Sequence, residues 1–296
     1  MVSHPIKNLF SGLIDYAGLF PPAKLDMDPA VTEYARQRRS KEAWMLSRFI
    51  VPAARLQELE AAMDRCRGAE DEGVWPLSVL VGGDLNAAKE RIDAFNVRNA
   101  GRAAVDAVEH RPQDADGVLA AAEIFDGFEI YFEVPHQEDP TAMFRAVRRA
   151  KARAKIRTGG VTDDAFPTPE EVGRFIRGAR MTGIPFKATA GLHHPLRGKY
   201  RLTYEDDPPS GTMHGFLNVF LAAAFVHHGE LPPELVPEIL KEQGTGAFEF
   251  SSAGVAWRGH RLSADELSDA RRNFATSYGS CSFQEPVDDL KTLHLL

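Results

Sequence analysis

The chain has 296 residues and a formal net charge of -7, with 44% hydrophobic and 26% charged residues. These values suit one large folded domain or two small ones, and the negative charge argues against a nucleic-acid partner. The two cysteines, Cys66 and Cys281, form no C-x-x-C motif, which is typical of a reducing compartment. The longest apolar run, 216–226, is too short to span a bilayer. We therefore expect a cytoplasmic protein with no membrane partner.

Strand-like apolar runs alternate with helix-like segments along the chain. The first five strands are expected at 12–20, 44–52, 75–83, 102–110 and 127–135. Helical spacing of apolar residues predicts helices at 29–39, 53–66 and 114–124, and further helices after residues 83 and 139. Strands six and seven are expected at 154–160 and 184–192. Between them, Thr168 and Pro169 form a helix start signal.

The eighth strand is expected at 246–254, and the last helix begins at Ser263. Eight strand-helix units in fewer than 300 residues predict a single α/β domain over 1–296, a (β/α)8 TIM-type barrel. The segment 195–246 is longer than a barrel normally places between strands seven and eight. It is predicted to form a lid-like helical insert over the C-terminal mouth. The tail 277–296 packs across one end of the barrel or contacts a second subunit, so a homo-oligomer is one alternative.

Two lysines within predicted parallel strands, Lys155 and Lys187, are the first chemical signal. Such strands are covered on both faces, and a buried lysine is costly unless it is paired or neutralised. Burial and a nearby like charge both lower the pKa of an amine, and a neutral amine forms a Schiff base with a carbonyl compound. Structural ion pairs are the competing explanation for both lysines.

Alternation along the strands adds further candidates around these lysines. Arg157 shares a face with Lys155, and Thr189 shares a face with Lys187. Carboxylates are expected from Asp106, together with His110, on strand four and from Glu133 on strand five. Asp15 on strand one is either a site carboxylate or the partner of a barrel lysine. Two lysines with an acid on a third strand are what a class I aldolase needs.

Short motifs in most of the strands resemble the deoxyribose-phosphate aldolase family. Strand six has K-I-R-T-G from Lys155, similar to the family's K-x-x-T-G, and strand seven has K-A-T-A-G from Lys187, similar to K-A-x-G-G. Strand four has V-D-A-V around Asp106. Further similarities are Ile14-Asp15-Tyr16, Phe49-Ile50-Val51-Pro52, Phe132-Glu133 and the serine pair Ser251-Ser252.

The resemblance implies a lyase that acts on a small carbonyl compound without a cofactor. Lys155 would form the Schiff base, Lys187 would tune it, and Asp106 would relay protons. The implied substrate contacts are Asp15, Glu133, Arg157, Thr158, Thr189, Gly191, His193, His194, Ser251 and Ser252. The chain departs from the family in its histidine pair after strand seven and in the long insert, which puts a phosphorylated sugar substrate in question.

Histidines open a second hypothesis. His193, His194 and His214 with a carboxylate would form a divalent metal site for a hydrolase or lyase, although no H-x-H spacing is present. A third hypothesis is a barrel that binds a small molecule without catalysis. The adjacent His227 and His228 lie at the end of the apolar helix and are interpreted as helix-end electrostatics.

Overall fold

The computed structural model describes residues 4–66, 73–137 and 139–296. Eight parallel strands form a closed barrel in the order β1-β13-β7-β6-β5-β4-β3-β2. The strands are β1 (Ile14–Tyr16), β2 (Leu46–Pro52), β3 (Trp75–Val81), β4 (Ala103–His110), β5 (Glu129–Glu133), β6 (Arg153–Arg157), β7 (Phe186–Thr189) and β13 (Ala275–Ser280). The predicted TIM-type barrel is confirmed.

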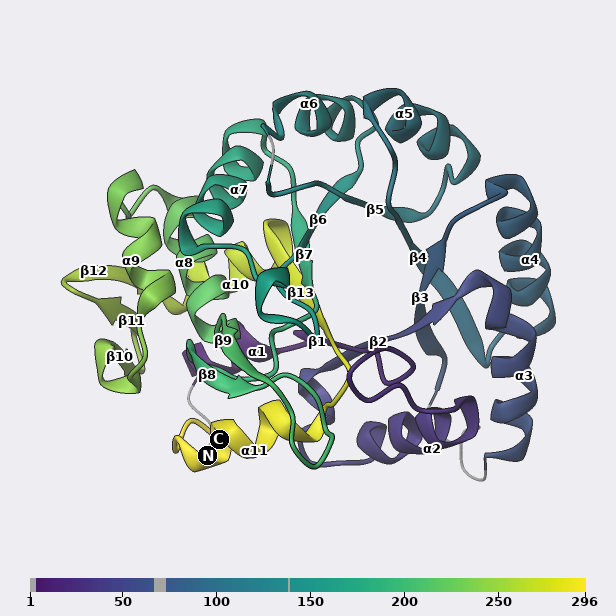
Figure 1. Cartoon of the computed structure of the whole chain (residues 1–296), viewed down its shortest axis with the longest axis horizontal. Helices are drawn as coiled ribbons and strands as arrows, with labels where there is room; N and C mark the ends of the chain where they lie inside the picture. Colours follow the sequence, from purple (N-terminus) through teal and green to yellow (C-terminus); the bar gives the residue numbers. More distant parts are fainter. Residues whose placement is uncertain (1–3, 67–72, 138) are drawn as a thin grey trace.

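Helices surround this barrel, and Figure 1 shows α2 to α7 outside the strands that they connect. The helices are α1 (His4–Phe10), α2 (Met27–Arg38), α3 (Leu56–Arg65), α4 (Leu85–Arg98), α5 (Ala115–Ile124), α6 (Thr141–Arg149), α7 (Pro169–Thr182), α8 (Phe216–His228), α9 (Val236–Lys241), α10 (Ala264–Asn273) and α11 (Gln284–Thr292). In the part of the chain that the structure describes, every helix is too short or too polar to cross a bilayer.

The predicted start of α7 is present in full. Thr168 accepts a hydrogen bond from the backbone N–H of Glu171, and the Glu171 side chain accepts one from the backbone N–H of Thr168. Ser263 and Glu266 form the same reciprocal cap at α10. Such caps satisfy backbone donors that a helix leaves free at its first turn. They place α7 and α10 against the barrel, each leading into the strand that follows.

The predicted eighth strand is wrong. The segment expected at 246–254 contains β10 (Phe248–Ser251), which pairs antiparallel with β11 (Gly254–Trp257) in a small sheet completed by β12 (His260–Ser263). The barrel is instead closed by β13, whose sequence is A-T-S-Y-G-S and whose last four residues, 277–280, were assigned to the tail. A strand that lines a crowded barrel interior needs small residues, so it lacks the apolar run that the sequence rule favours.

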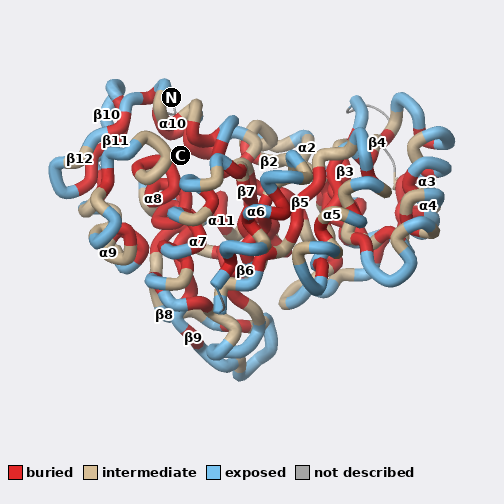
Figure 2. The backbone as a smooth tube through the Cα atoms, turned by 90° about the horizontal axis from the view of Figure 1, so that it is seen from above, coloured by how far each residue is buried: buried red, intermediate tan, exposed pale blue. Residues whose placement is uncertain are grey.

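This correction changes the boundaries of the insert. Between β7 and β13 the chain runs from 190 to 274 and forms the hairpin of β8 (Gly198–Arg201) and β9 (Ser210–Met213), α8, α9, the three-stranded sheet and α10. The segment that was predicted as a tail consists of the end of β13, followed by α11. Figure 2 shows the β8–β9 hairpin projecting from the barrel with exposed residues at its tip.

The apolar helix α8 is buried along almost its whole length, from Phe216 to Phe225. It packs against α7, α9 and α10. Its one polar residue in that stretch, Asn218, donates to the carbonyls of Ile239 and Glu242 at 2.8 and 3.0 Å and accepts from the Arg197 backbone N–H at 3.0 Å. These bonds satisfy a buried amide and connect α8 to α9 and to the loop after β7.

Candidate active site

The two lysines lie side by side inside the barrel. Lys155 on β6 is paired in register with Lys187 on β7. Both are buried, and Lys187 has no exposed surface. The expected adjacency of the two amines is therefore present.

Three carboxylates surround the lysine amines. Glu109 on β4 bridges them, with Oε1 2.7 Å from Lys187 Nζ and Oε2 3.1 Å from Lys155 Nζ. Asp15 on β1 lies 2.5 Å from Lys187 Nζ, and Glu133 on β5 lies 3.2 Å from Lys155 Nζ. With two ammonium groups and three carboxylates, this lysine–carboxylate cluster has a formal charge of −1. The three-carboxylate arrangement places Asp15 and Glu133 where the sequence analysis expected site carboxylates.

Hydroxyl groups fix the orientation of two of these carboxylates. Ser78 on β3 donates to Glu109 at 2.8 Å, and Ser277 on β13 donates to Asp15 at 2.7 Å. Both serines are buried. A buried carboxylate that accepts several hydrogen bonds stays charged and keeps one geometry.

The pKa of Lys187 moves opposite to the expected direction. Burial alone lowers this pKa, but the adjacent Asp15 and Glu109 carboxylates outweigh it and raise the pKa above its ordinary value. Burial likewise opposes ionisation of Glu109, yet Lys187 and Lys155 hold its pKa well below the usual range. Lys187 is thus protonated near neutral pH, because opposite charges surround it more closely than the second amine does.

A cavity of about 210 Å³ opens at the C-terminal ends of the strands, and it distinguishes the two lysines. Lys155 lines this cavity, which we call the mouth cavity, whereas Lys187 lies beneath it. The other polar or reactive side chains that line it are Glu109, Glu133, Arg157, Thr189, His193 and Cys281. A carbonyl compound in the mouth cavity therefore meets the amine of Lys155.

Asp106 is not part of this cluster. The pairing of β4 with β3 shifts register at this point, and Asp106 is the extra residue between Val105 and Ala107. Its half-exposed carboxylate pairs with Arg48 of β2 at 2.7 Å, in the N-terminal half of the strand. Asp106 and His110 were expected on the same, inward face of β4. This expectation is wrong, because the bulge shifts the residues that follow Asp106 to the other face of the strand.

Glu109 takes the position in the cluster that was predicted for Asp106. The sequence pattern did not indicate Glu109, because strict alternation from Asp106 places it on the outer face. In the sequence, Glu109 is marked by being a second carboxylate in the same short strand, three residues after Asp106. A single-residue bulge cannot be recognised from alternation alone, so the inward residue could not be chosen.

The loops after β6 and β7 come together at the rim of the mouth cavity. Thr158 is buried and donates to the Ala190 carbonyl at 2.6 Å, so its hydroxyl joins the two loops instead of facing the cavity. Gly191 has a φ of +73°, and a Cβ atom there would lie 2.8 Å from the Cα atom of Gly159. Only glycine fits both the left-handed backbone and this close approach.

Arg157 lies at the same rim, where it lines the mouth cavity. Among the described residues, no carboxylate forms an ion pair with its guanidinium, although Glu133 lines the same cavity. Glu133 instead contacts Lys155 and, at 3.7 Å, Arg111. An exposed guanidinium at a cavity rim is available for an anionic group of a ligand.

The structure does not bring together the three histidines of the alternative metal hypothesis, His193, His194 and His214. His193 Nδ1 contacts Glu285 at 3.0 Å, His194 Nδ1 contacts Asp289 at 2.6 Å, and His214 Nε2 contacts the Pro167 carbonyl at 2.6 Å. Each ring has its own partner, and across the described ranges these three do not gather their nitrogens around one point. Adjacent histidines on an extended chain point apart, which is the physical reason.

His193 is the member of this group that reaches the mouth cavity. Burial disfavours its protonation, but the Cys281 thiol at 4.0 Å and the Glu285 carboxylate raise its pKa to about 10. Tyr204, from the loop of the β8–β9 hairpin, donates to the same Glu285 carboxylate at 3.1 Å. The β8–β9 hairpin thus contacts α11 through Glu285, which also holds His193.

Three predicted substrate contacts lie away from the mouth cavity. Ser251 and Ser252 belong to the small sheet outside the barrel, where both are exposed. His194 stacks on Tyr200 of the hairpin and does not line the mouth cavity. The serine assignment depended on the incorrect eighth strand, so its failure follows from that correction.

The similarity of this chain to known proteins is confined to solved structures. No family model matches the sequence, and no curated protein matches it significantly. Among solved structures, "QR15, an Aldolase" is 11% identical, with a TM-score of 0.48 and 97% of each chain covered. Dihydropteroate synthase from Xanthomonas albilineans in complex with 7,8-dihydropteroate is also 11% identical, with a TM-score of 0.39, covering 97% of this chain and 94% of that chain.

Proposed function

We propose that the chain is a lyase that makes or breaks a carbon–carbon bond of a small carbonyl compound through a Schiff base on Lys155. The observation that carries this proposal is the position of the Lys155 amine. It lines the mouth cavity, and two carboxylates lie within 3.2 Å of it. A lysine needed only for an ion pair has no reason to be presented to a cavity.

The first step forms the imine. The Lys155 ammonium passes a proton to Glu133, whose oxygen is 3.2 Å away. The neutral amine adds to the carbonyl carbon, water leaves the carbinolamine, and a protonated imine remains. Lys187 stays charged beneath Glu109 and keeps that carboxylate ionised and in place.

The second step uses the imine as an electron sink. A carboxylate of the lysine–carboxylate cluster removes the proton from the β-hydroxyl group, and the bond between the α and β carbons breaks. Its electron pair moves to the iminium, so an aldehyde leaves and an enamine stays on Lys155. The enamine takes a proton at its α carbon, and water then hydrolyses the imine to release the second product and the free amine.

The mouth cavity also indicates the class of substrate. At about 210 Å³ it holds a molecule of a few carbon atoms. Arg157 at its rim is positioned for a carboxylate or phosphate on that molecule. We therefore expect a small oxo acid or an otherwise anionic aldehyde or ketone.

Borohydride trapping tests the proposal. Purified protein is incubated with a panel of small aldehydes and oxo acids, reduced, and measured by intact mass and peptide mapping. We expect one adduct on Lys155, which disappears in Lys155→Ala and in the bulkier Lys155→Met. Lys199→Ala changes an exposed lysine of the hairpin and should leave the adduct intact. An adduct that persists in both Lys155 variants would overturn the assignment.

A non-catalytic barrel is the second candidate function. It is favoured by the ion pairs of both lysines, at 2.5 to 3.2 Å. In this case the same ligands bind in the mouth cavity, with Arg157 as the anion contact, but form no covalent adduct. Trapping without any adduct, in protein that still binds an oxo acid by calorimetry, would select this function.

A further inference from the structure

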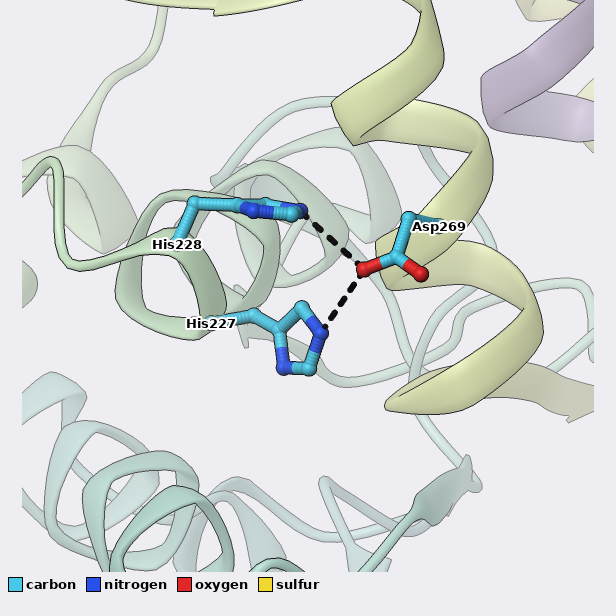
Figure 3. A group of neighbouring side chains, drawn as sticks. All are labelled: His227, His228 and Asp269. Atoms are coloured by element: carbon cyan, nitrogen blue, oxygen red, sulfur yellow. Dashed lines mark hydrogen bonds and ion pairs between the residues drawn. The ribbon is translucent and has the colours of Figure 1, made fainter.

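A group of metal-ligating side chains lies outside the barrel, where the end of α8 meets α10. His227 and His228 are the last two residues of α8, and Asp269 lies on α10. One ligand atom from each residue lies within 4.8 Å of the others, and none of the three lines the mouth cavity. Figure 3 shows both imidazole rings directed toward the same carboxylate.

The distances suit one small cation. His227 Nε2 is 3.1 Å and His228 Nε2 is 3.5 Å from Asp269 Oδ2. In a tetrahedral zinc site with bonds of about 2.0 to 2.1 Å, ligand atoms are separated by roughly 3.3 Å. Two of the three separations in this group are therefore already close to those of a zinc site.

The surroundings hold the three side chains in place. The His227 ring stacks on Phe274 at 4.9 Å, and about four fifths of each histidine side chain is buried. Asn273 donates a hydrogen bond to the second carboxylate oxygen of Asp269, Oδ1, at 2.7 Å. Asp269 Oδ2 is therefore left to face the two rings.

We propose that His227 Nε2, His228 Nε2 and Asp269 Oδ2 bind one zinc ion, with water as the fourth ligand. Imidazole and carboxylate ligands in this number suit zinc better than the hard cations calcium and magnesium. The metal would connect α8 to α10, and α10 leads directly through Phe274 into β13. It would thus stabilise the insert against the strand that closes the barrel, independently of the chemistry at Lys155.

Plain ion pairs are the competing explanation, because His228 Nε2 also lies 3.0 Å from the Glu266 carbonyl oxygen and both rings contact Asp269 without a metal. The two explanations differ in one measurable respect. A zinc site binds one equivalent of metal, and its affinity depends on each ligand. A pair of hydrogen-bonded histidines does neither.

The test is a titration of tag-free, EDTA-treated full-length protein with zinc chloride at pH 7.5, followed by calorimetry. We expect one equivalent to bind, with at least a tenfold loss of affinity in His228→Ala and in the isosteric Asp269→Asn. His260→Ala, which changes another histidine of the insert, should bind zinc as the unchanged protein does. Circular dichroism verifies that each variant is folded, and His227→Gln replaces any variant that is not.

Two further readouts use the same samples. Cobalt should give the visible absorption bands of a tetrahedral site, and zinc at 100 times its Kd should raise the Tm by about 5 °C. Failure to bind zinc at millimolar concentration would overturn the proposal. Binding that is equally strong in Asp269→Asn and His228→Ala would also overturn it, because the ion would then be adventitious. Neither result depends on whether Lys155 forms a Schiff base.

Discussion

The two ends of the barrel hold charged clusters of similar composition and different character. At the C-terminal end, Lys155 and Lys187 contact three carboxylates. At the N-terminal end, Arg48 contacts Asp106 at 2.7 Å and Glu129 at 3.3 Å, and Arg153 contacts Glu129 at 2.7 Å. Both clusters neutralise charge inside a barrel, but only the first contains lysines, and of these only Lys155 borders the mouth cavity.

The difference lies in the chemistry of the two cations. A guanidinium stays protonated at any pH a protein meets and binds carboxylates with a planar fork, so it suits a structural network. A lysine amine can become neutral and attack carbon, so it suits a reactive site. Under the proposed function, the barrel separates stability at one end from chemistry at the other, as (β/α)8 barrels generally do. The predictions below test this separation, beginning with the largest effect.

Removal of the Lys155 amine should abolish the proposed activity. In Lys155→Met the imine cannot form, and we expect turnover of the trapped substrate to fall by roughly 10⁴-fold or more. Steady-state kinetics measures this loss. The matched change at the other end of the barrel, Arg153→Met, should leave turnover within a few-fold of the unchanged protein. Equal losses in the two variants would contradict the separation.

Removal of the Lys187 amine should affect folding most. In Lys187→Met the buried carboxylates of Asp15 and Glu109 lose their shared cation, and such an uncompensated charge costs about 3–5 kcal/mol of the free energy of unfolding. Urea denaturation followed by circular dichroism measures this cost. Lys155→Met should cost less, since Lys155 borders the cavity and water can solvate Glu133. If Lys187→Met lowers the free energy of unfolding less than Lys155→Met does, Lys187 is not the cation that Asp15 and Glu109 share.

The low pKa of Glu109 should make the cluster sensitive to acid. Because the pKa in the folded state lies below that of the unfolded chain, the stabilisation is present above about pH 4.3 and is lost as the pH falls through the folded pKa. The free energy of unfolding of the unchanged protein should therefore decline below about pH 4. Glu109→Gln should be less stable near pH 7 and decline less steeply in acid. If the free energies of unfolding of the two proteins change in parallel with pH, Glu109 is not the source of the acid sensitivity.

The raised pKa of His193 should affect the stability of the protein at alkaline pH. A folded pKa above the unfolded value means that the stabilisation is complete below about pH 6.5 and is lost as the pH rises through about 10. We expect the unchanged protein to lose roughly 4 to 5 kcal/mol more than His193→Gln between these values, at about 1.4 kcal/mol per pH unit. Glu285→Gln removes the carboxylate partner of His193, so the free energy of unfolding of this variant should also decline less between these pH values. NMR titration of the ring would check the assignment directly.

The smallest effect is expected at the N-terminal end. Asp106 is half exposed and pairs with Arg48, so Asp106→Asn should cost about 1 kcal/mol or less and leave turnover unchanged. Thermal unfolding and kinetics measure the two effects. A large loss of turnover would instead restore Asp106 as the proton relay and would move the active end of the barrel.

The sequence was sufficient for the class of fold and for the two lysines. Alternating strand-like and helix-like segments predicted the barrel, and the capping signal at Thr168 marked the start of α7. Lys155 and Lys187 stood out because charged residues are rare in strands covered on both faces. These conclusions rest on local pattern and composition, which neighbouring elements do not alter.

The partners of those lysines were decided by the tertiary structure. One extra residue at Asp106 turned Glu109 inward, and small residues in β13 closed the barrel where an apolar run was expected at β10. The position of a bulge and the identity of the strand that closes the barrel both depend on which strands pair. That pairing is set by packing across the whole barrel. The chain by itself therefore determined which amines are available for chemistry. Only the closed barrel decided which carboxylates hold them and which amine faces the mouth cavity.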